Sequence, residues 1–396
     1  MGQKDSRTSL LNLAAFWNDA RIRALILQAL FLVAVLLFSL SVLDNTLNNL
    51  AQRGISTGFG FLSSEAGFGI LQTLIDYSED STFGRTFLVG LLNTLLVSFL
   101  GVVCATLLGF LIGVARLSSN WLISRLAATY IEIFRNIPLL LQIFFWYFAV
   151  LQALPSPRQS LSVGEMLFLN LRGLYLPKPM AEPGFWMVLV ALGAALIFCL
   201  GLGRWARKRR EQQGLDFPVL RLSLAVVLLL PLGTYFALDM PLAWELPRLQ
   251  GFNFRGGISL IPELTALLIA LSIYTAAFIA EIVRSGILAI PRSQTEAAKA
   301  LGLNPGQVLR LVVIPQALRV IIPPLTNQYL NLIKNSSLAT AIGYPDLVSV
   351  FAGTTLNQTG QAVEVIAMTM AVYLLISLSV SMFMNWYNKK IALVER

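Results

Sequence analysis

Long apolar stretches constrain this chain more than any other feature of its sequence. A helix that crosses a bilayer needs about 20 mostly apolar residues, and eight stretches meet that requirement. Charged residues make up only 12% of the chain, whereas soluble domains carry about 25%. The sequence therefore predicts an all-α integral membrane protein with about eight transmembrane helices, at residues 24–43, 86–115, 122–153, 185–203, 222–238, 260–290, 317–342 and 363–386.

Seven of these spans read as continuous apolar runs, and the stretch 317–342 does not. Pro323-Pro324 and Lys334-Asn335 interrupt it, and proline removes a helix hydrogen bond and clashes with the preceding turn. We therefore expect this span to be kinked or partly re-entrant.

The distribution of basic residues predicts the orientation in the membrane. With the N-terminus placed inside, twenty of the 29 Lys and Arg residues fall in inner segments, seven fall outside and two lie within helices. Short cytoplasmic loops carry such an excess, so both termini and the stretch 291–315 are expected in the cytoplasm. The basic run Arg204–Arg210 then fits a topology anchor beside anionic headgroups better than a nucleic-acid-binding patch.

Several kinds of chemistry are excluded by composition. The chain has no His, and its two Cys residues lie far apart in apolar runs, so we expect no metal site and no catalytic residues. It has no G-x-x-x-x-G-K-[ST] phosphate-binding loop. An enzyme, or a subunit that binds a nucleotide itself, is therefore not expected.

Four regions follow from the order of these features. Residues 1–85 form an N-terminal extension with the first helix and an external segment. Residues 86–153 form a helical hairpin, and residues 154–258 an insertion of two helices and two external loops. Residues 259–396 hold the remaining helices and the polar stretch between the prolines at 291 and 315.

The stretch Pro291–Pro315 is polar and marked by helix-ending residues. Ser293 and Glu296 have the spacing of a capping box, in which each side chain accepts from a backbone N–H of the first turn. Gly302 is placed to end that helix, and Asn304-Pro305 to begin another. The sequence therefore predicts two short helices joined by a sharp reversal.

This stretch carries a resemblance to a known family. "EAAKALG" (Glu296–Gly302), followed after nine residues by "VVIP" (Val312–Pro315), resembles the EAA loop of the membrane subunits of ABC importers. The segments "YTAAFIAEIVRSGILAIPRSQTEAA", "IEIFRNIPLLLQIFFWYF" and "LIKNSSLATAIG" are similar to the polar amino-acid permease subfamily, the histidine and glutamate type. With its extra first helix and its insertion, the chain resembles the longer permease subunits of bacterial general L-amino-acid systems.

The resemblance implies a type I ABC importer permease core in the bacterial inner membrane. It implies that the EAA loop, with Glu296, Ala297, Ala298, Gly302 and Pro315, couples to ATPase subunits, and that small alanines permit close docking. It further implies two ATP-binding subunits that hold ATP and Mg, a second homologous permease chain in a heterodimer, and a periplasmic amino-acid-binding protein. That binding protein would contact the loops at 154–184, 239–258 and 343–362 and deliver an L-amino acid.

Polar residues within the apolar spans are the candidates for a substrate pathway. An unpaired charge at membrane depth is costly, and a zwitterionic cargo needs a cation for its carboxylate and an anion or carbonyls for its amine. Glu132 and Arg135 are also spaced to pair on one helix face, and Glu281 could be structural near the inner face. The candidates are Glu132, Arg135, Asn136, Glu281, Asn327, Lys334, Asn335, Ser336 and Ser337.

Two other classes of protein remain open at this point. An ion-coupled secondary transporter could use Glu132 or Glu281 for protons, but it has no need of a capped cytoplasmic pair of helices. A non-transporting scaffold would not need Arg135 and Lys334 within the bilayer.

Overall fold

The computed structural model describes residues 20–52, 57–214 and 217–391. Both chain ends, whose cytoplasmic location is predicted above, lie outside these residues. The long helices are α2 (Ala20–Gln52), α3 (Phe83–Arg116), α6 (Phe185–Gln213), α7 (Val219–Ala237), α8 (Pro262–Leu288), α11 (Ile314–Asn335) and α13 (Ala362–Ile391). The shorter helices are α4 (Trp121–Asn136), α5 (Leu139–Phe144), α9 (Arg292–Ala300), α10 (Pro305–Val308) and α12 (Leu356–Thr359).

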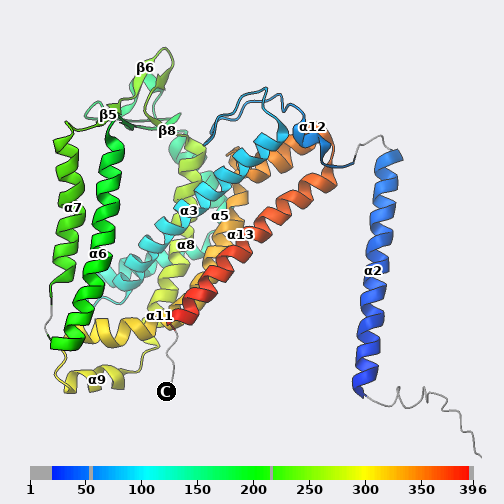
Figure 1. The fold of residues 1–396 in the computed structure, drawn as a ribbon. Coiled ribbons are helices and arrows are strands. Elements are labelled where there is room, and N and C mark those ends of the chain that lie inside the picture. Colours follow the sequence, from blue (N-terminus) through cyan, green and yellow to red (C-terminus); the bar gives the residue numbers. More distant parts are fainter. Residues whose placement is uncertain (1–19, 53–56, 215–216, 392–396) are drawn as a thin grey trace, which may run out of the picture.

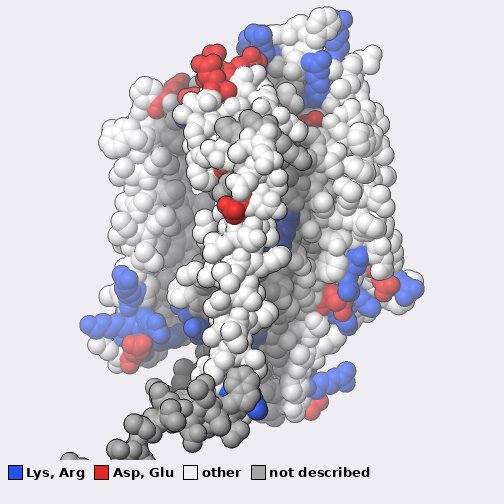
Figure 2. Space-filling model, turned by 90° about the vertical axis from the view of Figure 1, so that its right-hand side faces the viewer, with Lys and Arg blue, Asp and Glu red and all other residues white. Residues whose placement is uncertain are grey.

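The membrane-protein class predicted from hydropathy is confirmed. Among the described residues, seven helical segments are long and apolar enough to cross a membrane, and a bent pair would make an eighth. Charged side chains gather at the two ends of the molecule, and the belt between them is nearly free of charge on the face that Figure 2 shows. We call one end of the molecule the strand end, where β5, β6 and β8 lie in Figure 1. We call the other the lever end, where α9 lies, because the segment 291–315, named the lever below, is found there.

The prediction of one continuous helix at 122–153 is wrong. The chain bends by 105° between α4 and the segment Leu139–Leu151. Pro138 has no N–H and pushes the preceding residue, Ile137, out of the helical region. The buried Gln142 amide then donates to the carbonyls of Phe134 and Ile137, at 3.1 and 3.0 Å, and satisfies backbone groups that the break leaves free.

The span expected to be interrupted is more regular than its sequence suggests. α11 runs through Pro323 and Pro324 without ending. It ends at Asn335, where a 3₁₀ segment, Ser336–Ile342, continues the chain. The expected interruption therefore occurs at Lys334-Asn335 and not at the paired prolines.

The insertion contains strands as well as the two expected helices. A four-stranded antiparallel sheet has the order β1-β2-β3-β8, and two separate pairs are β4-β5 and β6-β7. The Phe254 ring of β7 contacts the rings of Phe168 of β2 and Tyr175 of β3 in tilted arrangements, with centroids 4.5 and 5.0 Å apart. The strands are β1 (Leu161–Val163), β2 (Leu167–Asn170), β3 (Gly173–Leu176), β4 (Lys178–Ala181), β5 (Leu242–Glu245), β6 (Arg248–Gln250), β7 (Asn253–Arg255) and β8 (Ile258–Leu260).

The core of the bundle is the close packing of α3 against α8. A Cβ on Gly109 would lie 2.6 Å from the Cβ of Ile279, and one on Gly113 would lie 2.8 Å from both the Ala280 carbonyl oxygen and the Val283 Cβ. Gly109 and Gly113 are four residues apart and share a helix face, as in the small-residue motifs that let membrane helices approach closely. The glycines therefore set the separation of the two helices.

We expect Gly113→Leu to lower the unfolding temperature of the detergent-purified protein. Overpacking a close contact typically costs about 1–3 kcal/mol, and here one neighbour is a backbone oxygen that cannot rotate away. Gly201→Leu on α6 is the matched control, because nothing lies within 4 Å of a Cβ built there. Equal unfolding temperatures for the two variants would contradict the packing argument.

A buried carboxylate holds the turn between α11 and α13. Asp346 is fully buried. Its Oδ1 accepts from the Ser349 N–H at 2.8 Å and from the Thr340 hydroxyl at 3.4 Å, and the Tyr373 hydroxyl donates to its Oδ2 at 3.4 Å. Burial raises the pKa of Asp346 to about 7, although these donors act in the opposite direction.

This raised pKa predicts a loss of stability with rising pH. Between the unfolded pKa of about 3.9 and the folded value, the native state binds more protons than the unfolded state, so stability falls from about pH 4 to about pH 7 and then levels off. Asp346→Asn keeps an acceptor oxygen and removes the titration, so its thermal unfolding midpoint should vary less over this range. The same slope in both proteins would show that Asp346 does not titrate there.

Candidate functional site

A charged cavity lies at the lever end of the bundle, between α3, α4 and α8. Its volume is about 410 Å³, within the range of small-ligand pockets. It brings together four of the predicted pathway residues with two arginines, Arg116 and Arg284, that the prediction of orientation counted with the inner segments. We call it the charged cavity; its lining is Arg116, Ala128, Ile131, Glu132, Arg135, Asn136, Phe278, Glu281 and Arg284.

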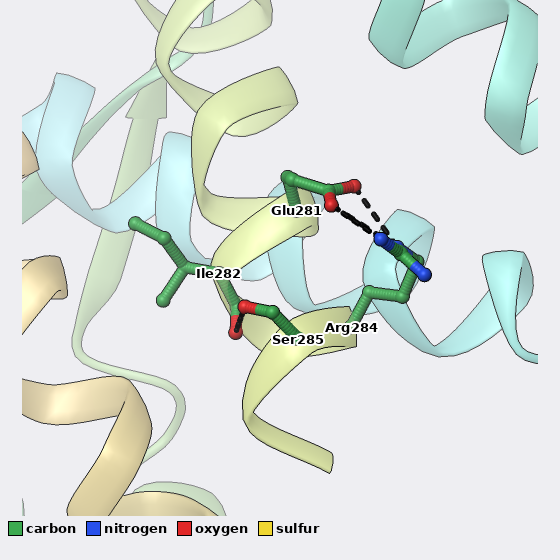
Figure 3. Close-up of polar contacts among 4 residues, drawn as sticks. All are labelled: Glu281, Ile282, Arg284 and Ser285. Carbon is green, nitrogen blue, oxygen red and sulfur yellow. Dashed lines mark hydrogen bonds and ion pairs between the residues drawn. The ribbon is translucent and has the colours of Figure 1, made fainter. Parts of the chain in front are cut away.

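One acid and one arginine of the cavity neutralise each other (Figure 3). Arg284 lies one turn after Glu281 on α8 and donates to both carboxylate oxygens, with the shortest contact from Nη2 to Oε1 at 2.6 Å. Ser285 turns away from this pair, and its hydroxyl donates to the Ile282 carbonyl at 3.0 Å. Glu281 is therefore an ion-pair member and not a free carboxylate.

The pairing of Glu132 with Arg135, one of the two interpretations of that spacing, is not found. Among the described residues, neither side chain forms an ion pair or a hydrogen bond. Arg135 lies over the Phe278 ring, with its Cζ 5.2 Å from the centroid, and the Asn136 amide donates to the Glu132 carbonyl oxygen at 2.7 Å. The cavity thus presents a carboxylate and a guanidinium without a polar side-chain partner.

The sequence analysis did not identify Arg116 as a cavity residue. It follows the apolar run 86–115 directly and was counted among the basic residues of the inner segments. Its Nη1 donates to the Ser124 hydroxyl at 2.9 Å, and that hydroxyl donates to the Arg116 carbonyl. The link closes the turn between α3 and α4. The cavity therefore holds three arginines and two glutamates.

The other predicted pathway residues lie outside this cavity. Ser336 and Ser337 donate to the carbonyls of Ile333 and Lys334, at 2.7 Å each, so their hydroxyls satisfy local backbone. Asn335 is half-buried at the end of α11. Asn327 and Lys334 are exposed, and their spacing of seven residues puts them on one face of α11.

The second candidate site is the lever, residues 291–315. α9 ends in the two hydrogen bonds of a Schellman motif, from Gly302 N–H to the Lys299 carbonyl and from Leu303 N–H to the Ala298 carbonyl. Gly302 has φ +81°, a left-handed conformation that favours glycine. The predicted reversal at Gly302 is present.

The predicted capping box of the first lever helix is wrong. α9 begins at Arg292 with Pro291 in the capping position, and no side chain caps it. Ser293 therefore lies inside the first turn. The capping box belongs to α10, where the Asn304 side chain accepts from the Gln307 N–H and the Gln307 side chain accepts from the Asn304 N–H, at 2.9 and 3.0 Å.

The side chains of the lever face in two directions, inward and toward solvent. Ala298 is only 5% exposed and packs inward with Val308 and Val313, so it supports the lever itself and is not available for direct docking. Glu296 and Ala297 are exposed. Leu301 is 83% exposed at the reversal, and the sequence analysis did not single it out.

Pro315 lies at the start of α11, directly after a π-helical segment, Leu309–Val313. Proline lacks a backbone N–H, which is tolerated in the first turn of a helix. The π-helical segment ends at Val313 and α11 begins at the next residue, so the lever is continuous with this long helix. Ile321 of α11 packs against Gly286 of α8.

Comparisons with known proteins identify the family to which this chain belongs. Residues 105–393 match the family described as "Binding-protein-dependent transport system inner membrane component". The chain belongs to this family, and it is therefore a membrane component of a transport system.

Individual relatives match nearly the whole chain. It is 56% identical over 390 residues to YhdX of Escherichia coli (strain K12), covering 98% of this chain and 99% of the relative. It is 51% identical over 378 residues to the general L-amino acid transport system permease protein AapQ of Rhizobium johnstonii, covering 96% and 94%. It is 42% identical over 413 residues to the glutamate/glutamine/aspartate/asparagine transport system permease protein BztB of Rhodobacter capsulatus, covering 96% of each chain.

The cavity charges should differ in their effect on stability. Arg284→Gln removes the partner of Glu281 and should cost about 1 kcal/mol, whereas Glu132→Gln breaks no polar contact between side chains and Arg135→Gln removes only the contact with the Phe278 ring. We expect the unfolding temperature in detergent to fall most for the Arg284 variant and least for the Glu132 variant. Equal losses in all three would mean that Glu132 and Arg135 have structural partners after all.

Proposed function

We propose that this chain is the permease subunit of an ATP-driven importer that carries polar L-amino acids across the bacterial inner membrane. The amino-acid class is supported by the printed functions of AapQ and BztB. The lever end would face the cytoplasm, together with both chain termini, in agreement with the excess of basic residues in the predicted inner loops.

The observation that carries the proposal is the lever. A short helix, a glycine reversal and a second capped helix project from the end of the bundle, and the second helix continues into the long helix α11. A docked ATPase subunit could therefore move a transmembrane helix directly. The exposed Leu301 would enter an apolar groove of that subunit, while the buried Ala298 keeps the two helices of the lever together.

The assembly would contain four further protein subunits. Two ABC subunits would bind ATP and Mg at the lever end, and a second homologous permease would form a heterodimer with this chain. The exposed polar face of α11, with Asn327 and Lys334, favours a water-filled pathway or a partner chain over lipid, because lipid does not solvate such groups. A periplasmic binding protein would contact the strand end at residues 154–184, 239–258 and 343–362.

The charged cavity would hold the amino acid near the lever end of its path. Arg135 would bind the carboxylate of the cargo and Glu132 its ammonium group, because neither charge forms an ion pair or a hydrogen bond with another described side chain. Phe278 holds the Arg135 guanidinium in position, and Asn136 adds a side-chain amide to the lining. The Glu281–Arg284 pair would shape the cavity without binding cargo.

The two alternatives are less well supported. A secondary transporter needs a titratable carboxylate free to exchange protons; Glu281 is bound to Arg284, which leaves that role to Glu132 alone. Neither that class nor a passive scaffold accounts for the lever or for membership of a binding-protein-dependent transport family.

Leu301→Asp should weaken the association of the permease with its ATPase subunits. A charge at the exposed tip would enter an apolar contact, so we expect less ATPase to co-purify and its stimulation by loaded binding protein to fall at least about tenfold. Leu71→Asp is the matched control, since Leu71 is similarly exposed, at 80%, but lies in the segment between α2 and α3. Full retention and stimulation in the Leu301 variant would exclude the tip from docking.

Glu132→Gln and Arg135→Gln should each reduce amino-acid uptake by at least about tenfold, because each removes a charge-assisted contact to the cargo. Arg125→Gln, an exposed position of α4 outside the cavity, serves as the control. Uptake is measured in vesicles that contain equal amounts of assembled complex. Normal uptake by both cavity variants would remove the cavity from the pathway.

A further inference from the structure

The charged cavity carries one positive charge more than the proposed binding of an amino acid uses. Its lining holds three arginines and two glutamates. Glu281 and Arg284 neutralise each other, because both carboxylate oxygens accept from the guanidinium. Glu132 and Arg135 supply one charge of each sign for the ammonium and α-carboxylate groups of the cargo. Arg116 is the cation that remains, and it gives the lining one net positive charge.

Among the described residues, one hydrogen bond to a side chain holds Arg116 at the cavity wall. Arg116 is the last residue of α3 and is half-buried. Its Nη1 donates to the Ser124 hydroxyl at 2.9 Å, and the same hydroxyl donates to the Arg116 carbonyl, also at 2.9 Å. A guanidinium group has five N–H donors. The contact with Ser124 therefore positions the group and leaves most of its donors for a ligand.

The two cations that remain for a cargo come from different helices. Arg116 ends α3, whereas Arg135 lies in the last turn of α4, where its Cζ is 5.2 Å from the centroid of the Phe278 ring. Glu132 lies one turn before Arg135. The cavity, of about 410 Å³, thus offers two separate guanidinium groups and one carboxylate. Since arginine binds a carboxylate through parallel hydrogen bonds, the complementary ligand has two carboxylates and one ammonium group.

We infer that Arg116 binds the side-chain carboxylate of the cargo and so makes the cavity selective for acidic L-amino acids over their amides. The inference rests on the proposed function, since it takes the cavity as the cargo site. An acidic amino acid carries one net negative charge and neutralises the cavity. Its amide has the same length and shape but leaves Arg116 without an anion, and a charge that loses its partner in a binding site lowers the affinity.

The test compares glutamate with glutamine, two amino acids of equal length that differ in this charge. The permease pair and its ATPase subunits are reconstituted in proteoliposomes, and ATP-driven uptake of each labelled amino acid is measured with the same binding protein. The preference of the binding protein cancels when the ratio of glutamate to glutamine uptake is compared between variants. Arg116→Gln should lower this ratio at least about tenfold, the loss of one charge-assisted contact. Arg116→Lys keeps the charge and should lower it less.

Ser124→Ala is the matched control. It removes the hydroxyl that Arg116 contacts and leaves the guanidinium in the chain, so the ratio of glutamate to glutamine uptake should stay close to that of the unmodified chain. If Arg116 only closed the turn between α3 and α4, Ser124→Ala and Arg116→Gln would alter uptake in the same way.

Two results would overturn the inference and leave the proposed function intact. The first is an unchanged ratio in the Arg116→Gln variant, whether the two uptake rates persist or fall together. The second is an equal change of the ratio in the Arg116→Gln and Ser124→Ala variants, which would mean that Arg116 acts through the turn and not on the cargo. The proposed function fails separately if the unmodified complex takes up no polar amino acid when ATP is supplied.

Discussion

The close contact between α3 and α8 is the constraint on which the rest of the structure depends. Helices in a bilayer gain little from burying apolar surface, so they associate through tight packing and polar contacts. Gly109 and Gly113 permit that packing, because a side chain at either position would overlap Ile279, Ala280 or Val283. Gly286 repeats the arrangement between α8 and Ile321 of α11. Three long helices are thus held at separations that only glycine allows.

This packing also places the charged groups. Glu281 and Arg284 flank Val283, the α8 residue that contacts Gly113, and Arg116 lies one turn beyond Gly113 on α3. The break at Pro138 turns the chain away after α4, which leaves Glu132 and Arg135 on the last turns of a short helix facing α8. A single tight crossing and a single proline therefore define the walls of the charged cavity. The lever is tied to the same crossing through α11.

Hydropathy predicted much of this fold because lipid imposes a strict requirement on the composition of spanning helices. It could not detect the break after Asn136, since Ile137 and Leu139, the neighbours of Pro138, are apolar and a bend of 105° does not itself change the hydropathy of the sequence. The proline itself was the available signal, together with Gln142, a polar residue in an apolar run. The strands of the insertion are three or four residues long, too short for an alternating pattern to be recognised.

Motif spacing predicted the lever but not the direction of its side chains. Gly302 was identified because its conformational requirement is local, whereas the inward direction of Ala298 depends on contacts with Val308 and Val313 that form only when the lever folds back. The same reason explains why Arg116 and Arg284 were counted with the inner segments and not with the candidate pathway. Their approach to Glu132 and Arg135 is a property of the helix crossing, and no local pattern encodes it.

The central claim is that transport through this chain is driven by ATP through the lever. The most direct measurement is uptake of a labelled polar L-amino acid into liposomes that contain the permease pair and its ATPase subunits, with the binding protein outside and no ion gradient. The account predicts uptake against a concentration gradient when ATP is trapped inside, and none with a non-hydrolysable analogue. Uptake that requires a proton or sodium gradient and proceeds without ATP would contradict it.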